Sequence, residues 1–212
     1  MPARKENLIR VIEALAGQAD RIIVALNGYS EVPQELQRFS NVECVITDNR
    51  LADGYKFLKV GECKGYYFGV DDDLLYPSTY VRDTISAIDR YHCIVSYHGK
   101  RFDRKPIVGY HRGFSFNVRC LGSLAGDMEV HVGGSGVMAW HSDDFKFSID
   151  DVGSPFMADL WVSKRAHEQG VKIMALAHKS DYFRYLGTPD TTIWVRRRGN
   201  PEETTLLKSF LS

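Results

Sequence analysis

Short apolar segments alternate with helix-like stretches along most of this chain. The apolar segments are about 6–8 residues long, far below the roughly 20 that a membrane-spanning helix needs. Strand-like segments occupy residues 21–26, 42–47, 66–70, 93–97, 137–140 and 171–177. Helical patterns occupy residues 6–16, 51–63 and 154–169, with a further helix opened by Pro77-Ser78 and a short last helix after Asn200-Pro201. This alternation predicts an α/β sandwich with a mainly parallel central sheet, folded as one domain over residues 1–212.

The charge and cysteine content of the chain limit the kinds of binding partner and the cellular compartment that we expect. The 212 residues include 27 Lys plus Arg and 27 Asp plus Glu, so the formal net charge is zero and a global basic field for nucleic acid or anionic membrane is excluded. The four cysteines form no CxxC pair, which is typical of free thiols in a reducing compartment. No apolar leader is evident at the start of the chain. We therefore expect a cytoplasmic protein without a transmembrane segment.

An acidic cluster directly follows one of the apolar segments. Asp71, Asp72 and Asp73 come after the strand predicted at 66–70, and the carboxyl end of a strand is where α/β sheets place ligands. Alternate residues of an extended chain point the same way, so Asp71 and Asp73 can share a target while Asp72 points elsewhere. Two convergent carboxylates suit Mn²⁺ or Mg²⁺, which also binds a diphosphate. The competing interpretation is a solvated acidic turn that caps the helix at Pro77.

Two other segments carry candidate chemistry. Asp159 lies in the first turns of the helix opened by Pro155, where its charge either stabilises the helix dipole or acts as a general base. Basic residues alternate with aromatic ones between Lys100 and Arg119, a pattern that suits nucleic acid, a diphosphate or an anionic acceptor, or else a solvated loop. The run Arg196-Arg197-Arg198 is expected at the surface.

The run GYYFGVDDDLLYP resembles the strand and DxD motif of the glycosyltransferase A fold, especially the family-2-like bacterial sugar transferases. The resemblance continues in three further segments, which are Ala25 to Tyr29, Gly133 to Met138, and Asp159-Leu160-Trp161 with Arg165 and Gly170 beyond it. The family's first strand is largely missing here, and Ala158 stands where the family usually has a glutamate.

The resemblance implies a metal-dependent, inverting transferase that moves a sugar from a nucleoside diphosphate sugar to an acceptor hydroxyl. The expected donor is a UDP-sugar. It implies a nucleotide-sugar-binding half over residues 1–97 and an acceptor-binding half over residues 98–212. Asp159 would be the general base, and Asp71, Asp73 and His178 would hold Mn²⁺ or Mg²⁺, with His141 as the rival to His178. The implied nucleotide contacts are Asn27, Lys56, Asp71 and Asp72, and the implied acceptor contacts are Gly133, Gly134, Trp140 and Trp161. Core packing is the alternative for both tryptophans.

Other functions stay open at this point. A nucleotidyltransferase would share the sheet and the metal but should carry a glycine-rich phosphate loop near its first strand. A non-catalytic module that binds carbohydrate or nucleotide would explain the missing strand but leaves Asp159 without a role. A glycan is the expected acceptor, and a modified DNA base is the less favoured one.

Overall fold

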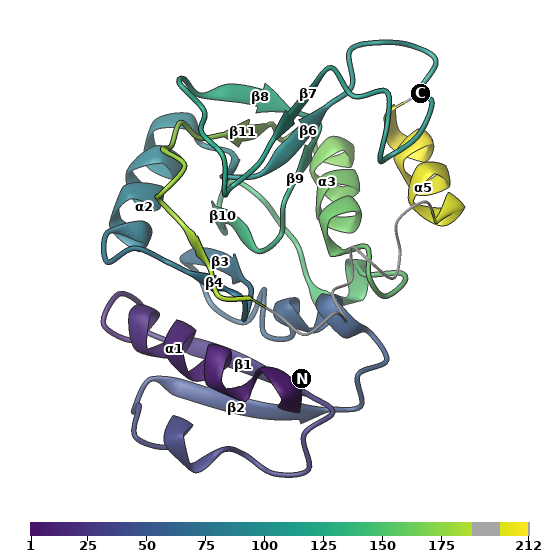
Figure 1. The fold of residues 1–212 in the computed structure, drawn as a ribbon. Helices are drawn as coiled ribbons and strands as arrows, with labels where there is room; N and C mark the ends of the chain where they lie inside the picture. The colour runs from purple at the N-terminus through teal and green to yellow at the C-terminus, as the bar shows by residue number, and fades with distance from the viewer. Residues whose placement is uncertain (188–199, 212) are drawn as a thin grey trace.

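A computed structural model describes residues 1–187 and 200–211 as layers of helices and strands (Figure 1). The central sheet has five strands in the order β3-β10-β5-β11-β8. Its members are β3 (Tyr66–Val70), β5 (Ile94–Ser96), β8 (Met128–Val130), β10 (Val137–His141) and β11 (Ile173–Ala175). The fold is therefore mixed α/β, as the alternation of segments predicted.

The expectation of a mainly parallel central sheet was wrong. β5 and β11 pair in parallel, whereas β10 is antiparallel to both β3 and β5, and β8 is antiparallel to β11. Antiparallel neighbours arise here because the segment before β10 is a set of turns and short strands, with no crossover helix to return the chain to the other end of the sheet.

Helices cover both faces of this sheet (Figure 1). On one face, α2 (Tyr80–Tyr91) packs with Val95, Val137 and Ala139 in the first hydrophobic cluster. On the other face, α3 (Ala158–Glu168) packs with Ile94 and Met138. Successive strand residues point to opposite faces, so burial on both sides makes β10 apolar along nearly its whole length. A last helix, α5 (Pro201–Leu211), packs against α3 in a third cluster.

The N-terminal layer consists of α1 (Lys5–Leu15) and a parallel pair of strands, β1 (Ile22–Asn27) and β2 (Val42–Thr47). The chain enters α1 through a 3-10 turn at Pro2–Arg4, so the first strand of the described chain is β1. Leu8, Ile12 and Leu15 line the buried face of α1 and join the first hydrophobic cluster together with β1. This layer lies beside the turn that follows β3 (Figure 1).

The middle of the chain forms short strands and turns, as its lack of periodicity indicated. β6 (Gly99–Arg101) pairs with β7 (Phe116–Val118) and with β9 (Val132–Gly133). β4 (Leu74–Leu75) pairs with β12 (Arg184–Tyr185). The segment expected to be helical at 51–63 contains a 3-10 helix at Ala52–Phe57 instead, and turns follow it.

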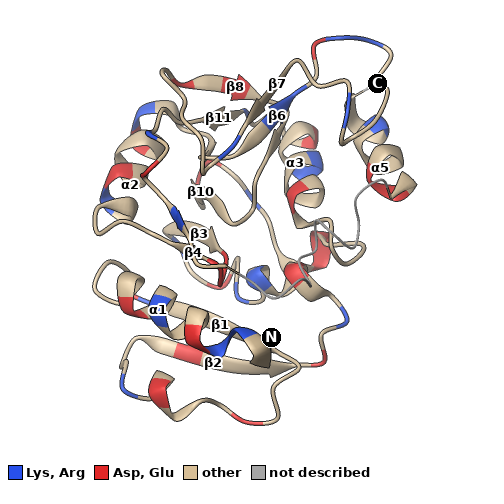
Figure 2. Ribbon diagram, viewed as in Figure 1, with Lys and Arg blue, Asp and Glu red and all other residues tan. Residues whose placement is uncertain are grey.

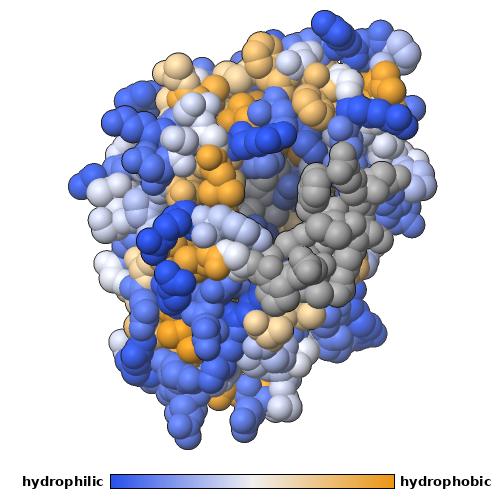
Figure 3. Space-filling view, viewed as in Figure 1, coloured by the Kyte–Doolittle hydropathy of each residue, from blue (hydrophilic) through white to orange (hydrophobic). Residues whose placement is uncertain are grey.

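The surface and the thiols agree with a globular chain. No helix within the described residues is long and apolar enough to cross a membrane. The face in Figure 3 is largely hydrophilic, with small separate apolar groups. All four cysteines are free.

Candidate active site

Several polar segments lie at one end of the central sheet, which we call the sheet edge, where the strands begin or terminate. β3 and β5 end at this edge, and β10, which runs the other way between them, begins there. Asp71 follows β3, His98 follows β5, and Ser135 and Gly136 precede β10. A Cβ on Gly136 would lie 1.8 Å from Oδ2 of Asp71, so this glycine is what allows the two turns to touch. The antiparallel course of β10 thus brings the acidic turn and the glycine-rich turn together.

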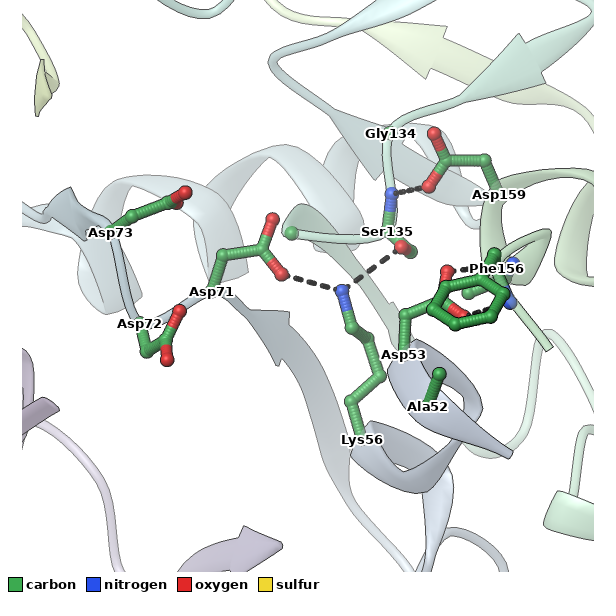
Figure 4. A network of polar contacts seen from close by, with 12 residues as sticks. Ala52, Asp53, Lys56, Asp71, Asp72, Asp73, Gly134, Ser135, Phe156 and Asp159 are labelled. Carbon is green, nitrogen blue, oxygen red and sulfur yellow. Dashed lines mark hydrogen bonds and ion pairs between the residues drawn. The ribbon is translucent and has the colours of Figure 1, made fainter. Parts of the chain in front are cut away.

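The acidic turn, residues 71–73, is neutralised by two cations of the protein itself. Lys56 Nζ lies 2.6 Å from Oδ1 of Asp71 (Figure 4). Arg4 Nη1 lies 2.7 Å from Oδ1 of Asp72 and 3.7 Å from Oδ2 of Asp73. Figure 4 shows the Asp73 side chain directed toward Asp71. Asp73 is partly buried, and this burial, with the charges of Asp71 and Asp72, raises its pKa to about 6.

Lys56 connects this turn to the glycine-rich turn. Its ammonium also donates to Oγ of Ser135, at 3.1 Å. Burial opposes the charged form of Lys56, but the carboxylates of Asp71, Asp53 and Asp159 outweigh it and raise the pKa of the ammonium. Lys56 therefore stays protonated and holds one fixed positive charge at the sheet edge.

Asp159 is held by the other side of the same turn. The backbone N–H of Ser135 donates to Oδ1 of Asp159 at 2.7 Å. Asp53, from the 3-10 helix, accepts the backbone N–H groups of Phe156 and Ala158 at 2.6 and 3.1 Å and so caps the start of α3. The cap fixes the first turn of the helix that carries Asp159, and burial raises the pKa of the Asp53 carboxyl.

Part of this network lines one cavity of about 660 Å³, whose lining includes Asp71 but not Asp72 or Asp73. Lys56 and Asp71 contribute from the β3 side, Asp159 from α3, and the β6–β7 hairpin from the opposite side. The lining also includes Asp53, His98, Lys100, Tyr110, His111, Asn117, Arg119, Ser135 and Glu203. The predicted residues Lys56, Asp71 and Asp159, although far apart in the sequence, therefore share one cavity. Figure 2 shows acidic residues in the turn after β3 and basic residues on β6.

The donor set of the acidic turn fits a hard divalent cation. Among residues 1–187 and 200–211, no three His, Cys, Asp or Glu side chains lie together so as to hold a metal by themselves. Mg²⁺ and Mn²⁺, however, are commonly held by one or two carboxylates and completed by substrate phosphates. In the free protein the Asp71 carboxylate faces Lys56, while Asp73 points toward Asp71 (Figure 4), so the two could supply those carboxylates once a diphosphate arrives and Asp71 turns from Lys56. The chemistry of their oxygens fits this kind of site.

Neither of the two histidines predicted as metal ligands is available to the acidic turn. Both ring nitrogens of His178 face backbone carbonyls, with Nδ1 at 2.7 Å from the oxygen of Leu176 and Nε2 at 3.1 Å from that of Arg119. In this arrangement neither nitrogen is free for a metal. His141 pairs with Tyr66 at the start of β3, so it lies at the opposite edge of the sheet from Asp71. The antiparallel course of β10 places it there, which the sequence could not show.

The structure places the residues expected to contact the acceptor behind the cavity. Trp140 is 1% exposed and packs against Phe57, Phe145 and Phe147, so it is a core residue and offers no face to a sugar. Trp161, a residue of α3, is partly buried against apolar core residues, and its Nε1 donates to Oγ of Ser154.

The two glycines expected to contact the acceptor, Gly133 and Gly134, are buried and lie against side chains. A Cβ on Gly134 would meet the side chain of His98 at 2.8 Å, and one on Gly133 would meet Met138 at 2.6 Å. Their small size therefore serves the packing that positions Ser135, the residue of this turn that lines the cavity.

The nucleotide-side residues outside the cavity are tied into the scaffold. Asn27, at the end of β1, donates from Nδ2 to the carbonyl of Ala52 at 2.9 Å and accepts from Thr47. This contact joins the N-terminal layer to the 3-10 helix that carries Asp53 and Lys56. Asp72 is occupied by Arg4, as described above. The arginine run at 196–198 lies outside the described residues.

Sequence reasoning missed several residues of the cavity. Asp53 and Glu203 lie far in sequence from their partners, Phe156 with Ala158 and His111, and Asn117 carries no sequence signal of its own. Glu203 of α5 is buried, and its Oε2 lies 2.6 Å from Nε2 of His111. Local sequence signals do not report contacts of this range.

Comparison with known proteins adds no relative. No family model matches the chain, and no curated protein matches it significantly.

Proposed function

We propose that this protein is a metal-dependent glycosyltransferase that moves a sugar from a nucleoside diphosphate sugar, with UDP as the expected nucleotide, to an acceptor hydroxyl with inversion. One observation carries the proposal. A cation, a carboxylate at a strand end and a second carboxylate on a helix, Lys56, Asp71 and Asp159, meet in one cavity through Ser135. Such a transfer needs neutralisation of the leaving diphosphate and a base for the acceptor, and these residues match both needs.

Asp159 would act as the base. Oδ1 is held by the Ser135 N–H, which fixes the carboxylate and directs the remaining oxygen, Oδ2, to the acceptor. As the acceptor oxygen forms its bond to the anomeric carbon, its proton passes to Asp159. The bond from that carbon to the diphosphate oxygen breaks, and the electron pair leaves with the nucleoside diphosphate. A single displacement of this kind inverts the anomeric centre.

Lys56 and the acidic turn would serve the leaving group. The Lys56 ammonium can move from Asp71 to the diphosphate oxygen, which gains negative charge as the bond breaks. A divalent cation bound by Asp71 and Asp73 would supply Lewis-acid neutralisation of the same charge. We expect the pairings of the acidic turn to rearrange when a donor binds, because Lys56 and Arg4 occupy its carboxylates in the free protein.

Slow donor hydrolysis tests the proposal. The protein is incubated with Mn²⁺ and a panel of nucleotide sugars, and release of the nucleoside diphosphate is followed. We expect release from a UDP-sugar, and calorimetry should show that UDP binds more tightly with Mn²⁺ than without it. Asp73→Ala should abolish that difference.

The alternative functions give distinct results. Consumption of a nucleoside triphosphate with pyrophosphate release would replace the proposal by a nucleotidyltransferase. UDP binding without hydrolysis of any donor, in the presence or absence of acceptors, would indicate a non-catalytic module.

A further inference from the structure

The β6–β7 hairpin directs four polar side chains to one face. Lys100 lies opposite Asn117 in the antiparallel register, and opposite residues have their side chains on the same face. His98 and Arg119 are each two residues away from one of these, so an extended chain presents them on that face as well. All four line the cavity that contains Asp159. We call this set of four the basic wall.

Among residues 1–187 and 200–211, the two cations of the basic wall have no carboxylate in direct contact. Within the described parts of the chain, neither Lys100 nor Arg119 forms an ion pair with a carboxylate. Lys100 Nζ instead lies 3.5 Å from the centre of the Tyr110 ring. Of the carboxylates in this cavity, Asp53 caps α3 and Glu203 pairs with His111. Asp159 accepts from the Ser135 N–H and acts on Lys100 without forming an ion pair with it. An anion in the cavity would therefore meet two available cations.

The charge of Lys100 persists at neutral pH. Burial lowers the pKa of its ammonium to about 8, while Asp159 and Glu203 act in the opposite direction. Arg119 carries its charge at any physiological pH. A partly desolvated cation binds an anion more strongly than a fully hydrated one, because less water must be displaced on binding.

Asn117 adds an independent sign of a ligand. Its Oδ1 is buried and has no hydrogen-bond partner within the described residues, although Asn117 lines the cavity. A buried acceptor without a donor is costly, and a hydroxyl group from a ligand would satisfy it. The basic wall thus offers a site for an anionic group beside a site for a hydroxyl.

We propose that the acceptor is an anionic saccharide, whose phosphate or carboxylate binds Lys100 and Arg119 while a neighbouring hydroxyl donates to Oδ1 of Asn117. That this saccharide is the acceptor rests on the proposed function. Its binding can be tested without donor or metal. A cavity bounded on the other side by Asp159 suits a compact sugar whose reacting hydroxyl faces that carboxylate.

Calorimetry in metal-free buffer at pH 7 tests the site. The probes are glucose, glucose 1-phosphate, glucose 6-phosphate and glucuronate, titrated into the protein alone. We expect at least one anionic sugar to bind about tenfold or more tightly than glucose, the difference that charge-assisted hydrogen bonds typically produce. Comparison of the two sugar phosphates with glucuronate shows whether the basic wall binds a phosphate or a carboxylate.

Variants locate the binding. Lys100→Gln with Arg119→Gln should reduce the preference to about twofold or less, and Lys100→Arg should keep most of it. Arg104→Gln is the matched control, because Arg104 lies in the same hairpin, is exposed and is not in the cavity lining. Unchanged affinity for UDP with Mn²⁺ in the double variant would show that the fold and donor side are intact.

Three outcomes would overturn the proposal. The first is equal binding of glucose and all anionic sugars. The second is a preference that Lys100 and Arg119 do not cause, shown either by its survival in the double variant or by its loss on competition with UDP, which would place the anion on the donor side. The third is tighter binding of a DNA oligonucleotide than of any sugar phosphate, which would assign the wall to a nucleic acid acceptor. None of these results bears on donor hydrolysis, so failure of this inference and failure of the proposed function are separable.

Discussion

The acidic turn and the basic wall are two charged regions near one cavity, and they differ in how their charges are compensated. Every carboxylate of residues 71–73 lies near Lys56 or Arg4. Lys100 and Arg119, in contrast, form no ion pair with any described residue. Under the proposed function, a metal ion would replace Lys56 and Arg4 at these carboxylates. The counterion of Lys100 and Arg119 would instead come from the acceptor. The two regions therefore predict different binding events, which are replacement of an internal cation at the acidic turn and binding of an anion at the basic wall.

Asp159 lies between these regions, and its replacement should have the largest effect. Asp159→Asn keeps the shape and the contact to the Ser135 N–H but removes the basic oxygen. We expect the transfer rate to fall by about 10²–10⁴-fold, with UDP affinity unchanged. Asp150→Asn, at an exposed carboxylate before α3, is the control. Near wild-type turnover in Asp159→Asn would reduce this residue to a helix-stabilising role.

The contact between Gly136 and Asp71 gives the next largest effect. A Cβ on Gly136 would collide with the Asp71 carboxylate, whose flexible end must then swing away. Gly136→Ala should therefore weaken the Mn²⁺-dependent binding of UDP by about tenfold or more while the fold persists. Gly126→Ala, where the added methyl group meets nothing within 4 Å, is the control. Calorimetry with UDP and Mn²⁺ measures both, and equal affinities would show that Asp71 does not hold the metal.

Arg4 tests the exchange character of the acidic turn. If its guanidinium competes with a metal for Asp72 and Asp73, Arg4→Gln should tighten Mn²⁺ binding by a few-fold, roughly what one nearby charge in a partly hydrated site contributes. Arg10→Gln, at an exposed arginine of α1, should leave the affinity unchanged. Weaker Mn²⁺ binding in Arg4→Gln would mean that Arg4 orders the turn, which would break the contrast drawn above.

The smallest effect concerns the buried charge of Lys100. Its pKa is about 8 in the folded protein and ~10.4 in an unfolded chain. Between these values the unfolded state binds more protons, so the free energy of unfolding rises with pH. The cost of burying the charge is thus fully present below pH ~8 and is lost toward pH ~10.4. The ammonium faces Tyr110 and lies near Asp159 and Glu203.

Lys100→Met should accordingly stabilise the protein most at pH 7, with the gain shrinking as the pH approaches 10. Urea unfolding at the two pH values measures this, with Lys105→Met at an exposed position as the reference. A gain that does not change with pH would show that Lys100 is not desolvated.

Strands and helices with a strong local hydrophobic pattern could be predicted from the sequence. The relative direction of neighbouring strands in the sheet could not. The strands predicted at 42–47 and 66–70 are confirmed as β2 and β3 with the same bounds. The helix predicted from Pro155 starts at Ala158, because Phe156 has a left-handed backbone (φ 64°) and Asp53 caps the amides before the helix. Period-2 alternation is the same for parallel and antiparallel strands, so the reversal of β10 could not be inferred.

The same limit applies to the site. Lys56, Asp71 and Asp159 could be proposed because a strand end and a family-like spacing mark them. The sequence left both acceptor stacking and core packing open for Trp140, and its neighbours in the folded chain, Phe57, Phe145 and Phe147, make it part of the core. The basic wall depends on the register that sets Lys100 against Asn117, and only the folded hairpin supplies that register.

The interleaved order of the central sheet has a consequence for how such a chain can be assembled or recombined. β3 and β5 come from residues 1–97, but β10, from residues 98–212, is inserted between them. A fragment of residues 1–97 would expose the β3 and β5 edges that β10 covers, which are templates for aggregation. Neither fragment would hold the Lys56–Ser135 contact, so the candidate site could form only when both are present. Exchange of halves between related genes would therefore have to preserve the match between two strand edges as well as the residues of the site.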